Sequence, residues 1–283
     1  MRRQPVHLFL SALAYGAFVV VVAWAAAFLS GTVVPRTVDG PVRVAAGPAV
    51  ATDVALLLLF AVQHSLMARR PVKRALERWV PPALGRTAFV LATVACLTAL
   101  LALWQPVEGW VWRVDGPWAV VLWSGFAAGW ALALVSTFLV DHLEFTGLRQ
   151  TGWAGPDDRP GAATPTPLVQ AGLYGIVRHP MMVGLLIAFW CTPRMSVGHL
   201  LFATAASGYI AVGVRFEERD LRRDIGPAYG HYAERVPSLV PGWRPRPRQG
   251  ESTPGPRTVH TVSKDADPAR TTVVPSPETR RHP

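Results

Sequence analysis

Long apolar runs constrain the fold of this chain more than any other feature of its sequence. The first, Val6 to Leu29, contains no Asp, Glu, Lys or Arg, and a helix that crosses a bilayer needs about 20 mostly apolar residues. This run is too long for the core of a signal peptide, so we expect a retained helix. Three further runs of suitable length are Val50 to Met67, Thr87 to Trp104 and Trp118 to Val140.

The last apolar stretch is divided by Pro193-Arg194. Its first part, Met181 to Thr192, is too short to cross upright, and its second part is Val197 to Phe216. The first part is either a re-entrant half-helix or one arm of a tight helical hairpin. The sequence therefore predicts an all-α polytopic membrane protein with about five to six membrane helices, the last two forming a hairpin.

The composition agrees with a membrane protein and argues against a soluble enzyme. Hydrophobic residues make up 51% of the 283 residues and charged residues 16%, against about 25% charged in average proteins. Both cysteines lie inside apolar runs, which argues against a disulfide framework or a cysteine-based metal cluster. The net charge of +10 lies mostly in one short loop and in the C-terminal tail, so we expect a lipid bilayer and not nucleic acid as the partner.

Basic residues predict the orientation in the membrane. The most basic short loop is Arg69-Arg70-Pro71-Val72-Lys73-Arg74, whereas the loops around Arg36 to Arg43 and Glu108 to Asp115 are nearly neutral. Short loops rich in Lys and Arg stay in the cytoplasm, so we expect both termini there. Residues 1–243 are assigned to a membrane-embedded domain, and 244–283 to a basic, Pro-rich tail that is predicted to be disordered.

Four polar groups fall at the same predicted membrane face, the cytoplasmic one. Polar residues at membrane depth cost free energy and usually serve a function. The groups are Gln63-His64-Ser65, Asp141-His142-Leu143-Glu144, Tyr174 to Pro180, and Glu217-Glu218-Arg219-Asp220-Leu221. Their convergence predicts a functional site at that face.

The segment Arg178-His179-Pro180 is predicted to open a helix. Pro180 suits the first turn, where its missing N–H is no loss. Arg178 and His179 then lie at a helix N-terminus with free backbone N–H groups, a natural anion site, and the arginine fork suits a carboxylate or phosphate. Gly184, one turn further, allows close approach of a ligand or of a neighbouring helix. The alternative is an interfacial pair that contacts only lipid headgroups.

Glu217 and Glu218 are adjacent, so on a helix they point about 100° apart. One can pair with a surface arginine while the other faces inward. An inward carboxylate opposite Arg178 and His179 would give separate places for the carboxylate and the ammonium of a zwitterionic amino-acid moiety. A solvated, charged helix end is the alternative.

His64 and His142 are candidates for accepting a proton, because histidine titrates near neutral pH. For either residue alone, an interfacial histidine satisfied by backbone or water is the simpler interpretation. No two histidines show the spacing of metal ligands, so we expect no metal site. The sequence also contains no phosphate-binding glycine loop and no dinucleotide fingerprint.

The same residues resemble a known family. Tyr174 to Pro180 with Gly184, then Glu217-Glu218, and the ending with Tyr229, Tyr232 and Val236-Pro237 resemble the membrane methyltransferases related to isoprenylcysteine carboxyl methyltransferase. Further motifs look closer to the methanethiol S-methyltransferases within that superfamily. They are Phe60 to Arg69, Trp104-Gln105-Pro106, Phe145 to Gln150 and Phe189-Trp190-Cys191-Thr192-Pro193.

The resemblance implies S-adenosylmethionine as the methyl donor, bound at the cytoplasmic face. The residues implied to bind it are Arg178, His179, Pro180, Gly184, Glu217, Glu218, Tyr229 and Tyr232. His64 and His142 are the candidate catalytic bases, and Gln63 and Glu144 are the expected substrate contacts. Met182 stands where the family usually has a tyrosine, so any contact from that hydroxyl is missing.

The implied reaction is methylation of a small thiol, with methanethiol as the favoured acceptor and dimethyl sulfide as the product. A thiol is mostly protonated at pH 7, so a nearby base must take up its proton. Two alternatives stay open. One is a methyltransferase that acts on a prenylcysteine-like or other lipophilic acceptor, and the other is a non-enzymatic membrane protein on the same scaffold.

Overall fold

The computed structural model describes residues 5–140 and 170–242. Five helices in this part of the chain are long and apolar enough to cross a membrane. They are α1 (Pro5–Ser30), α2 (Ala46–Ala68), α4 (Gly85–Leu103), α5 (Pro117–Val140) and α8 (Val197–Ile225). The shorter apolar helix α7 (Pro180–Trp190) precedes α8. The predicted all-α polytopic membrane fold is confirmed, while the predicted tail 244–283 lies outside the described residues.

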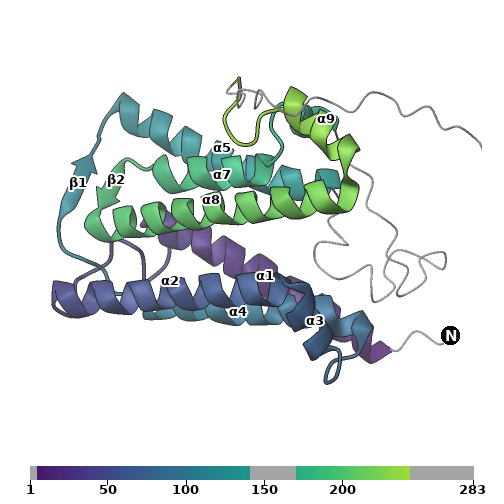
Figure 1. Ribbon diagram of the computed structural model, residues 1–283. Coiled ribbons are helices and arrows are strands. Elements are labelled where there is room, and N and C mark those ends of the chain that lie inside the picture. Colours follow the sequence, from purple (N-terminus) through teal and green to yellow (C-terminus); the bar gives the residue numbers. More distant parts are fainter. Residues whose placement is uncertain (1–4, 141–169, 243–283) are drawn as a thin grey trace, which may run out of the picture. The chain divides into compact units, whose positions relative to one another are not determined.

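The helices form two layers (Figure 1). One layer contains α1, α2 and α4, and the other contains α5, α7 and α8. At one end, the β end, β1 (Trp110–Arg113) pairs antiparallel with β2 (Arg194–Ser196). At the other end, the α9 end, lie α3 (Arg70–Leu76) and α9 (Pro227–Arg235). The beginnings of α1 and α7 and the ends of α2, α5 and α8 also lie at the α9 end.

The helices α7 and α8, with β2 between them, form the predicted hairpin. The chain turns back after Thr192, whose carbonyl oxygen accepts a hydrogen bond from Trp112 Nε1 at 2.9 Å. Ser196 then caps α8, because its hydroxyl accepts from the backbone N–H of His199 at 3.0 Å. The short helix is therefore one arm of a hairpin, and the turn of this hairpin contains β2, which pairs with β1 from the connection between α4 and α5.

The helix α8 is longer than the apolar run that predicted it. The run ends at Phe216, whereas the helix ends at Ile225. Its last two turns are rich in Glu and Arg, which form helices well and prefer water to lipid. The helix therefore continues beyond the apolar region and stops at Gly226, whose φ of +70° is a conformation that glycine adopts without strain.

Two glycines allow α5 and α7 to pack backbone to backbone. A Cβ atom on Gly184 would lie 2.6 Å from the carbonyl oxygen of Gly129, and one on Gly129 would lie 2.7 Å from the carbonyl oxygen of Gly184. Ala133 and Ala188 follow one turn later on each helix. Small residues at four-residue spacing are typical of close helix pairs in membranes. Of the two roles predicted for Gly184, the structure shows the contact with a neighbouring helix.

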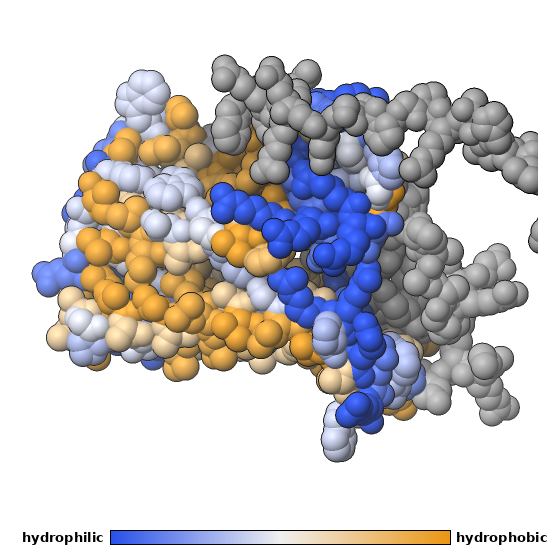
Figure 2. Space-filling model, in the orientation of Figure 1, coloured by the Kyte–Doolittle hydropathy of each residue, from blue (hydrophilic) through white to orange (hydrophobic). Residues whose placement is uncertain are grey.

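Apolar side chains cover the outside of the helices. Val20, Leu58 and Val120, from three different helices, are each more than half exposed. Figure 2 shows hydrophobic residues across much of the visible face and hydrophilic residues gathered toward the α9 end. In a soluble protein such exposed apolar surface would be costly, whereas a bilayer covers it.

Candidate active site

The side chain of Arg178 joins three segments at the α9 end. Its Nε donates to Glu218 Oε1 on α8 at 3.0 Å, and its Nη2 donates to the same oxygen. Its Nη1 donates to the carbonyl oxygens of Ala233, at 3.0 Å, and of Val236. The side chain is only 2% exposed. Arg178 therefore ties the start of α7 to α8, to α9 and to the segment after α9.

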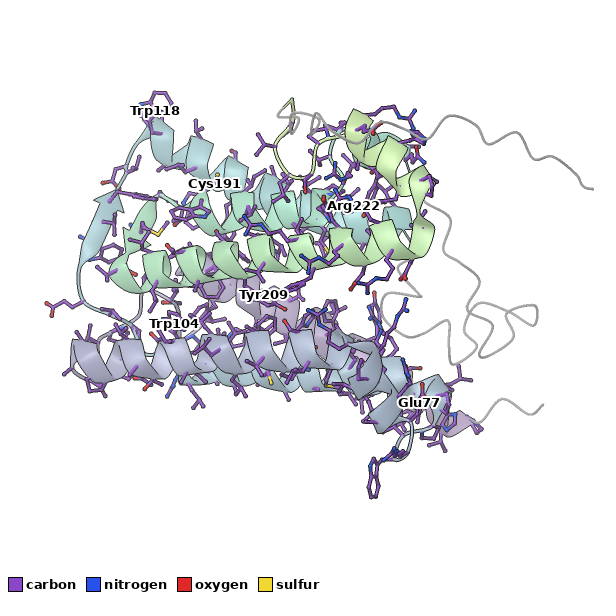
Figure 3. All side chains as sticks on the ribbon, viewed as in Figure 1. Glu77, Trp104, Trp118, Cys191, Tyr209 and Arg222 are labelled. Carbon is purple, nitrogen blue, oxygen red and sulfur yellow. The ribbon has the colours of Figure 1, made fainter. Side chains whose placement is uncertain are left out.

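Glu218 is the inward member of the glutamate pair. Besides Arg178, its Oε1 accepts from the Ser238 hydroxyl at 2.8 Å, and its Oε2 accepts from Arg222 Nη2 at 3.1 Å. Figure 3 labels Arg222 on α8 near the α9 end. The side chain of Glu217, in contrast, is 53% exposed. The expectation that one glutamate faces inward while the other does not is confirmed, and the structure shows which one it is.

Two geometric expectations about Arg178 are wrong. The backbone N–H groups of Arg178 and His179 are not free, because they donate to the carbonyl oxygens of Pro237 at 2.9 Å and Ser238 at 3.2 Å. The Arg178 guanidinium and the Glu218 carboxylate also do not occupy separate places, because they pair with each other. The N–H groups are taken up because the segment after α9 comes back to the start of α7. The two charges share one place because Arg178 and Glu218, which are 40 residues apart in the sequence, pair in the folded chain.

His179 lies between the two glutamates. Its Nδ1 is 3.6 Å from Glu217 Oε2, and its Nε2 is 3.4 Å from Glu218 Oε1. The imidazole is buried, whereas Glu217 reaches the surface of the described structure. His179 and Glu217 therefore form the outer edge of a cluster whose inner part is the ion pair of Arg178 and Glu218.

Two tyrosines of α9 complete this cluster. Tyr232 donates its hydroxyl to the carbonyl oxygen of Tyr174 at 2.6 Å, and its ring meets that of Tyr229 edge to face. The Tyr229 hydroxyl is buried beside Arg178 but has no hydrogen bond of good geometry to any described residue. Burial raises the pKa of Tyr229 to about 12, with a contribution from the Glu218 carboxylate. Tyr229 is therefore a neutral phenol that can donate a hydrogen bond.

Pro180 begins α7, as its fixed φ predicts, and is buried. Met182, which stands where the resemblance would expect a tyrosine, packs against the apolar core. Neither Pro180 nor Met182 has a polar side-chain group that could bind Arg178 or Glu218. Gly184, in contrast, lets α7 pack closely against α5 and so helps to set the position of Arg178.

His64 lies apart from this cluster, between the two layers. Its Nδ1 is 3.4 Å from the Thr93 hydroxyl of α4, and its ring contacts those of Phe60, Phe89 and Tyr209. Figure 3 shows Tyr209 between α8 and α2. The neighbouring Gln63 donates to Met67 Sδ at 3.2 Å, while its carbonyl oxygen is buried with no partner among the described residues. His142 and Glu144 lie outside the described residues.

One row of α8 runs from the surroundings of His64 toward His179. Tyr209, Gly213 and Glu217 are spaced four residues apart and so lie along one side of the helix. Gly213, in the middle of this row, is exposed, and a Cβ atom on it would have no atom within 4 Å. Two residues of this row therefore contact the two histidines: Tyr209 contacts His64, and Glu217 contacts His179.

Several polar partners were not predicted from the sequence. Ser238 follows Val236-Pro237 directly and binds Glu218, while Thr93 and Tyr209 surround His64. All three are uncharged, and Thr93 and Tyr209 lie inside apolar runs, where a hydroxyl is a weaker signal than a charge. A search for every hydroxyl in the predicted membrane helices would have found the latter two.

A second buried polar cluster lies toward the β end. His199 Nδ1 is 3.8 Å from Asp39 Oδ2, and His199 Nε2 is 3.2 Å from the carbonyl oxygen of Phe189. Nearby in the fold, Asp53 Oδ1 accepts from the backbone N–H of Gln105 at 2.8 Å. Among the described residues, no group of three His, Cys, Asp or Glu side chains is arranged to hold a metal ion.

The fold and the cluster together define a polytopic helical membrane protein with charged and aromatic residues gathered where its last helices meet. The chain is 42% identical over 238 residues to a methanethiol S-methyltransferase of Mycobacterium tuberculosis. The aligned region covers 81% of this chain and 93% of that protein. It is 41% identical to methanethiol S-methyltransferase 2 of Bradyrhizobium diazoefficiens, over 81% of this chain and 87% of the relative. The chain belongs to the methanethiol S-methyltransferase family.

A further relative is a methanethiol S-methyltransferase of a Pseudomonas species, 41% identical over 76% of this chain and 82% of the relative. No family model and no solved structure matches the chain.

Proposed function

We propose that this protein transfers the methyl group of S-adenosylmethionine to methanethiol and releases dimethyl sulfide. The observation that carries the proposal is the 42% identity to a methanethiol S-methyltransferase over 93% of that relative's length. The name of the relative supports the thiol acceptor. The methyl donor is our inference from the motifs that the sequence shares with membrane methyltransferases.

The residues of the cluster fit this donor. When bound, S-adenosylmethionine supplies a methyl group attached to a positively charged sulfur. Glu217 offers an exposed carboxylate to the donor's ammonium, and the buried hydroxyl of Tyr229 offers a hydrogen bond that no described residue takes up. We assign His179 to the same binding surface because it contacts Glu217.

Arg178 and Glu218 have a different proposed task. Their charges already pair with each other, so neither is free to neutralise a ligand. Their bonds to Ala233, Val236 and Ser238 hold α9 and the following segment in place. We propose that this ion pair shapes the cofactor site, with Pro180 and Gly184 fixing the helix from which Arg178 projects.

The methyl acceptor must lose a proton before its sulfur can act as a nucleophile. Methanethiol is small and apolar, so it can enter from the bilayer between helices. We propose His64 as the base, with Gln63 beside it as a polar contact to the substrate. Along α8, Gly213 lies between Tyr209, whose ring contacts His64, and Glu217, and a Cβ atom on Gly213 would meet nothing within 4 Å. The roles predicted for His142 and Glu144 stay predictions.

Headspace gas chromatography tests this proposal. Membranes that contain the protein, supplied with S-adenosylmethionine and methanethiol, should release dimethyl sulfide. Glu217→Gln should lower the rate strongly because it removes the exposed carboxylate, whereas Glu234→Gln, at an exposed acid on α9, should leave the rate unchanged. Binding of S-adenosylmethionine without dimethyl sulfide would contradict the proposed acceptor, and absence of binding would contradict the proposed donor.

A further inference from the structure

The surroundings of His64 determine where its proton lies. Thr93, on the neighbouring helix α4, has its hydroxyl oxygen 3.4 Å from His64 Nδ1. The same hydroxyl is 2.9 Å from the carbonyl oxygen of Phe89, one turn earlier on α4. A carbonyl oxygen can only accept a hydrogen bond, so the single hydroxyl proton of Thr93 is directed at Phe89.

Toward His64 Nδ1, the Thr93 hydroxyl oxygen therefore presents a lone pair and can only accept a hydrogen bond. A hydrogen bond between Thr93 and Nδ1 then requires that Nδ1 carries the proton and donates it. In a neutral imidazole, this leaves Nε2 as the nitrogen with a free lone pair. No described residue makes a hydrogen bond with Nε2, so that nitrogen is available to a substrate.

Aromatic contacts hold the imidazole in this orientation. The ring of Phe60 stacks on it with centroids 5.5 Å apart and an interplanar angle of 22°. Phe89 packs on it at 4.9 Å, and Tyr209 meets it edge to face at 6.4 Å. Rotation of the ring would have to displace these neighbours. Tyr209 is in turn held by Ser65, whose hydroxyl is 3.3 Å from the phenol oxygen.

We propose that Thr93 is a positioning residue that fixes His64 as the Nδ1–H tautomer, so that Nε2 accepts the proton of the thiol. In this step the S–H bond of the thiol breaks, an N–H bond forms at Nε2, and the products are a thiolate and an imidazolium whose Nδ1–H stays bonded to Thr93. The inference rests on the proposed function for the identity of the thiol. The tautomer itself is independent of it.

Nitrogen NMR of the purified protein in detergent, labelled with ¹⁵N-histidine, tests the tautomer directly. The His64 signals are assigned by their loss in His64→Gln. The wild-type protein and Thr93→Ser should show Nδ1 protonated and Nε2 unprotonated. Thr93→Val, which keeps the side-chain shape but removes the acceptor, should lose this preference and should lower the rate of dimethyl sulfide formation by about tenfold or more.

Thr87→Val is the matched control. Thr87 lies on the same helix, and its buried hydroxyl has no partner among the described residues, so this change should leave the His64 signals and the rate unaltered. A wild-type His64 protonated at Nε2 would overturn the proposal, as would a Thr93→Val protein with an unchanged tautomer. A lost tautomer preference with an unchanged rate would also overturn the positioning role. If the wild-type protein makes no dimethyl sulfide, the NMR result still decides the tautomer, and only the proposed function fails.

Discussion

At the residue scale, the pairing of Arg178 with Glu218 supports the structural role that we propose for this ion pair. Each nitrogen of the Arg178 guanidinium donates to an oxygen of the protein, and these oxygens belong to α8, to α9 and to the segment after α9. Removing one partner of such a buried pair leaves the other charge uncompensated. The effect of a substitution should therefore appear first in stability.

Arg178→Gln should lower the free energy of unfolding by about 3 to 5 kcal/mol. Arg222→Gln removes another partner of the same Glu218, but from a side chain that is 52% exposed, and should cost about 1 kcal/mol or less. Thermal unfolding in detergent, followed by tryptophan fluorescence, compares the two variants. Equal losses in both would show that Arg178 is not the main tether of the cluster.

Tyr229 should make the cluster sensitive to alkaline pH. Burial raises the pKa of Tyr229 from 10 to about 12 in the folded protein. Between these values the folded state holds a proton that the unfolded state has lost, so the contribution to stability is full below pH 10 and falls as the pH rises toward 12. Ultraviolet titration of phenolate should show a tyrosine that ionises only above about pH 11 and that Tyr229→Phe removes. Ionisation near pH 10 would contradict the burial of the phenol.

Local patterns predicted which residues gather at the α9 end, but not how they pair. The adjacency of Glu217 and Glu218 showed that only one of them could face inward. It could not show that Glu218 meets Arg178, because that contact depends on how α7 and α8 pack. The predicted free N–H groups failed for a similar reason, since residues after α9 return to bind them.

At the element scale, the crossing of α5 and α7 depends on Gly184. Gly184→Ala should destabilise the protein strongly, because the new methyl group would lie 2.6 Å from backbone atoms of α5, which cannot move aside separately. Gly208→Ala on α8 is the control, since its methyl group would meet nothing within 4 Å. The yield of monodisperse protein in detergent and its Tm measure both effects. A stable Gly184→Ala protein would contradict the close packing.

The helices themselves were predictable from apolar runs, because a bilayer demands a minimum length of apolar helix. Most ends agree with the structure within a few residues, as for Val6 to Leu29 against Pro5–Ser30. The pair of β1 and β2 was not predicted. Its strands have four and three residues and pair across some 80 positions, so neither carries a local pattern that indicates a sheet.

At the scale of the whole molecule, the basic residues predict that the α9 end faces the cytoplasm. A green fluorescent protein fused after the last residue should fluoresce, and alkaline phosphatase in the same place should be inactive. Phosphatase fused after Asp115, beyond β1 and so at the β end, should be active. The opposite pattern of activities would show that the orientation predicted from Arg and Lys is inverted.

In the proposed reaction, this protein transfers a methyl group from S-adenosylmethionine to methanethiol. The most direct test supplies purified protein with S-adenosylmethionine whose transferable methyl group is fully deuterated, together with unlabelled methanethiol, and analyses the headspace by mass spectrometry. We expect dimethyl sulfide that carries one deuterated and one ordinary methyl group. Absence of labelled dimethyl sulfide from a folded protein, or transfer of the label to lipid instead, would contradict it.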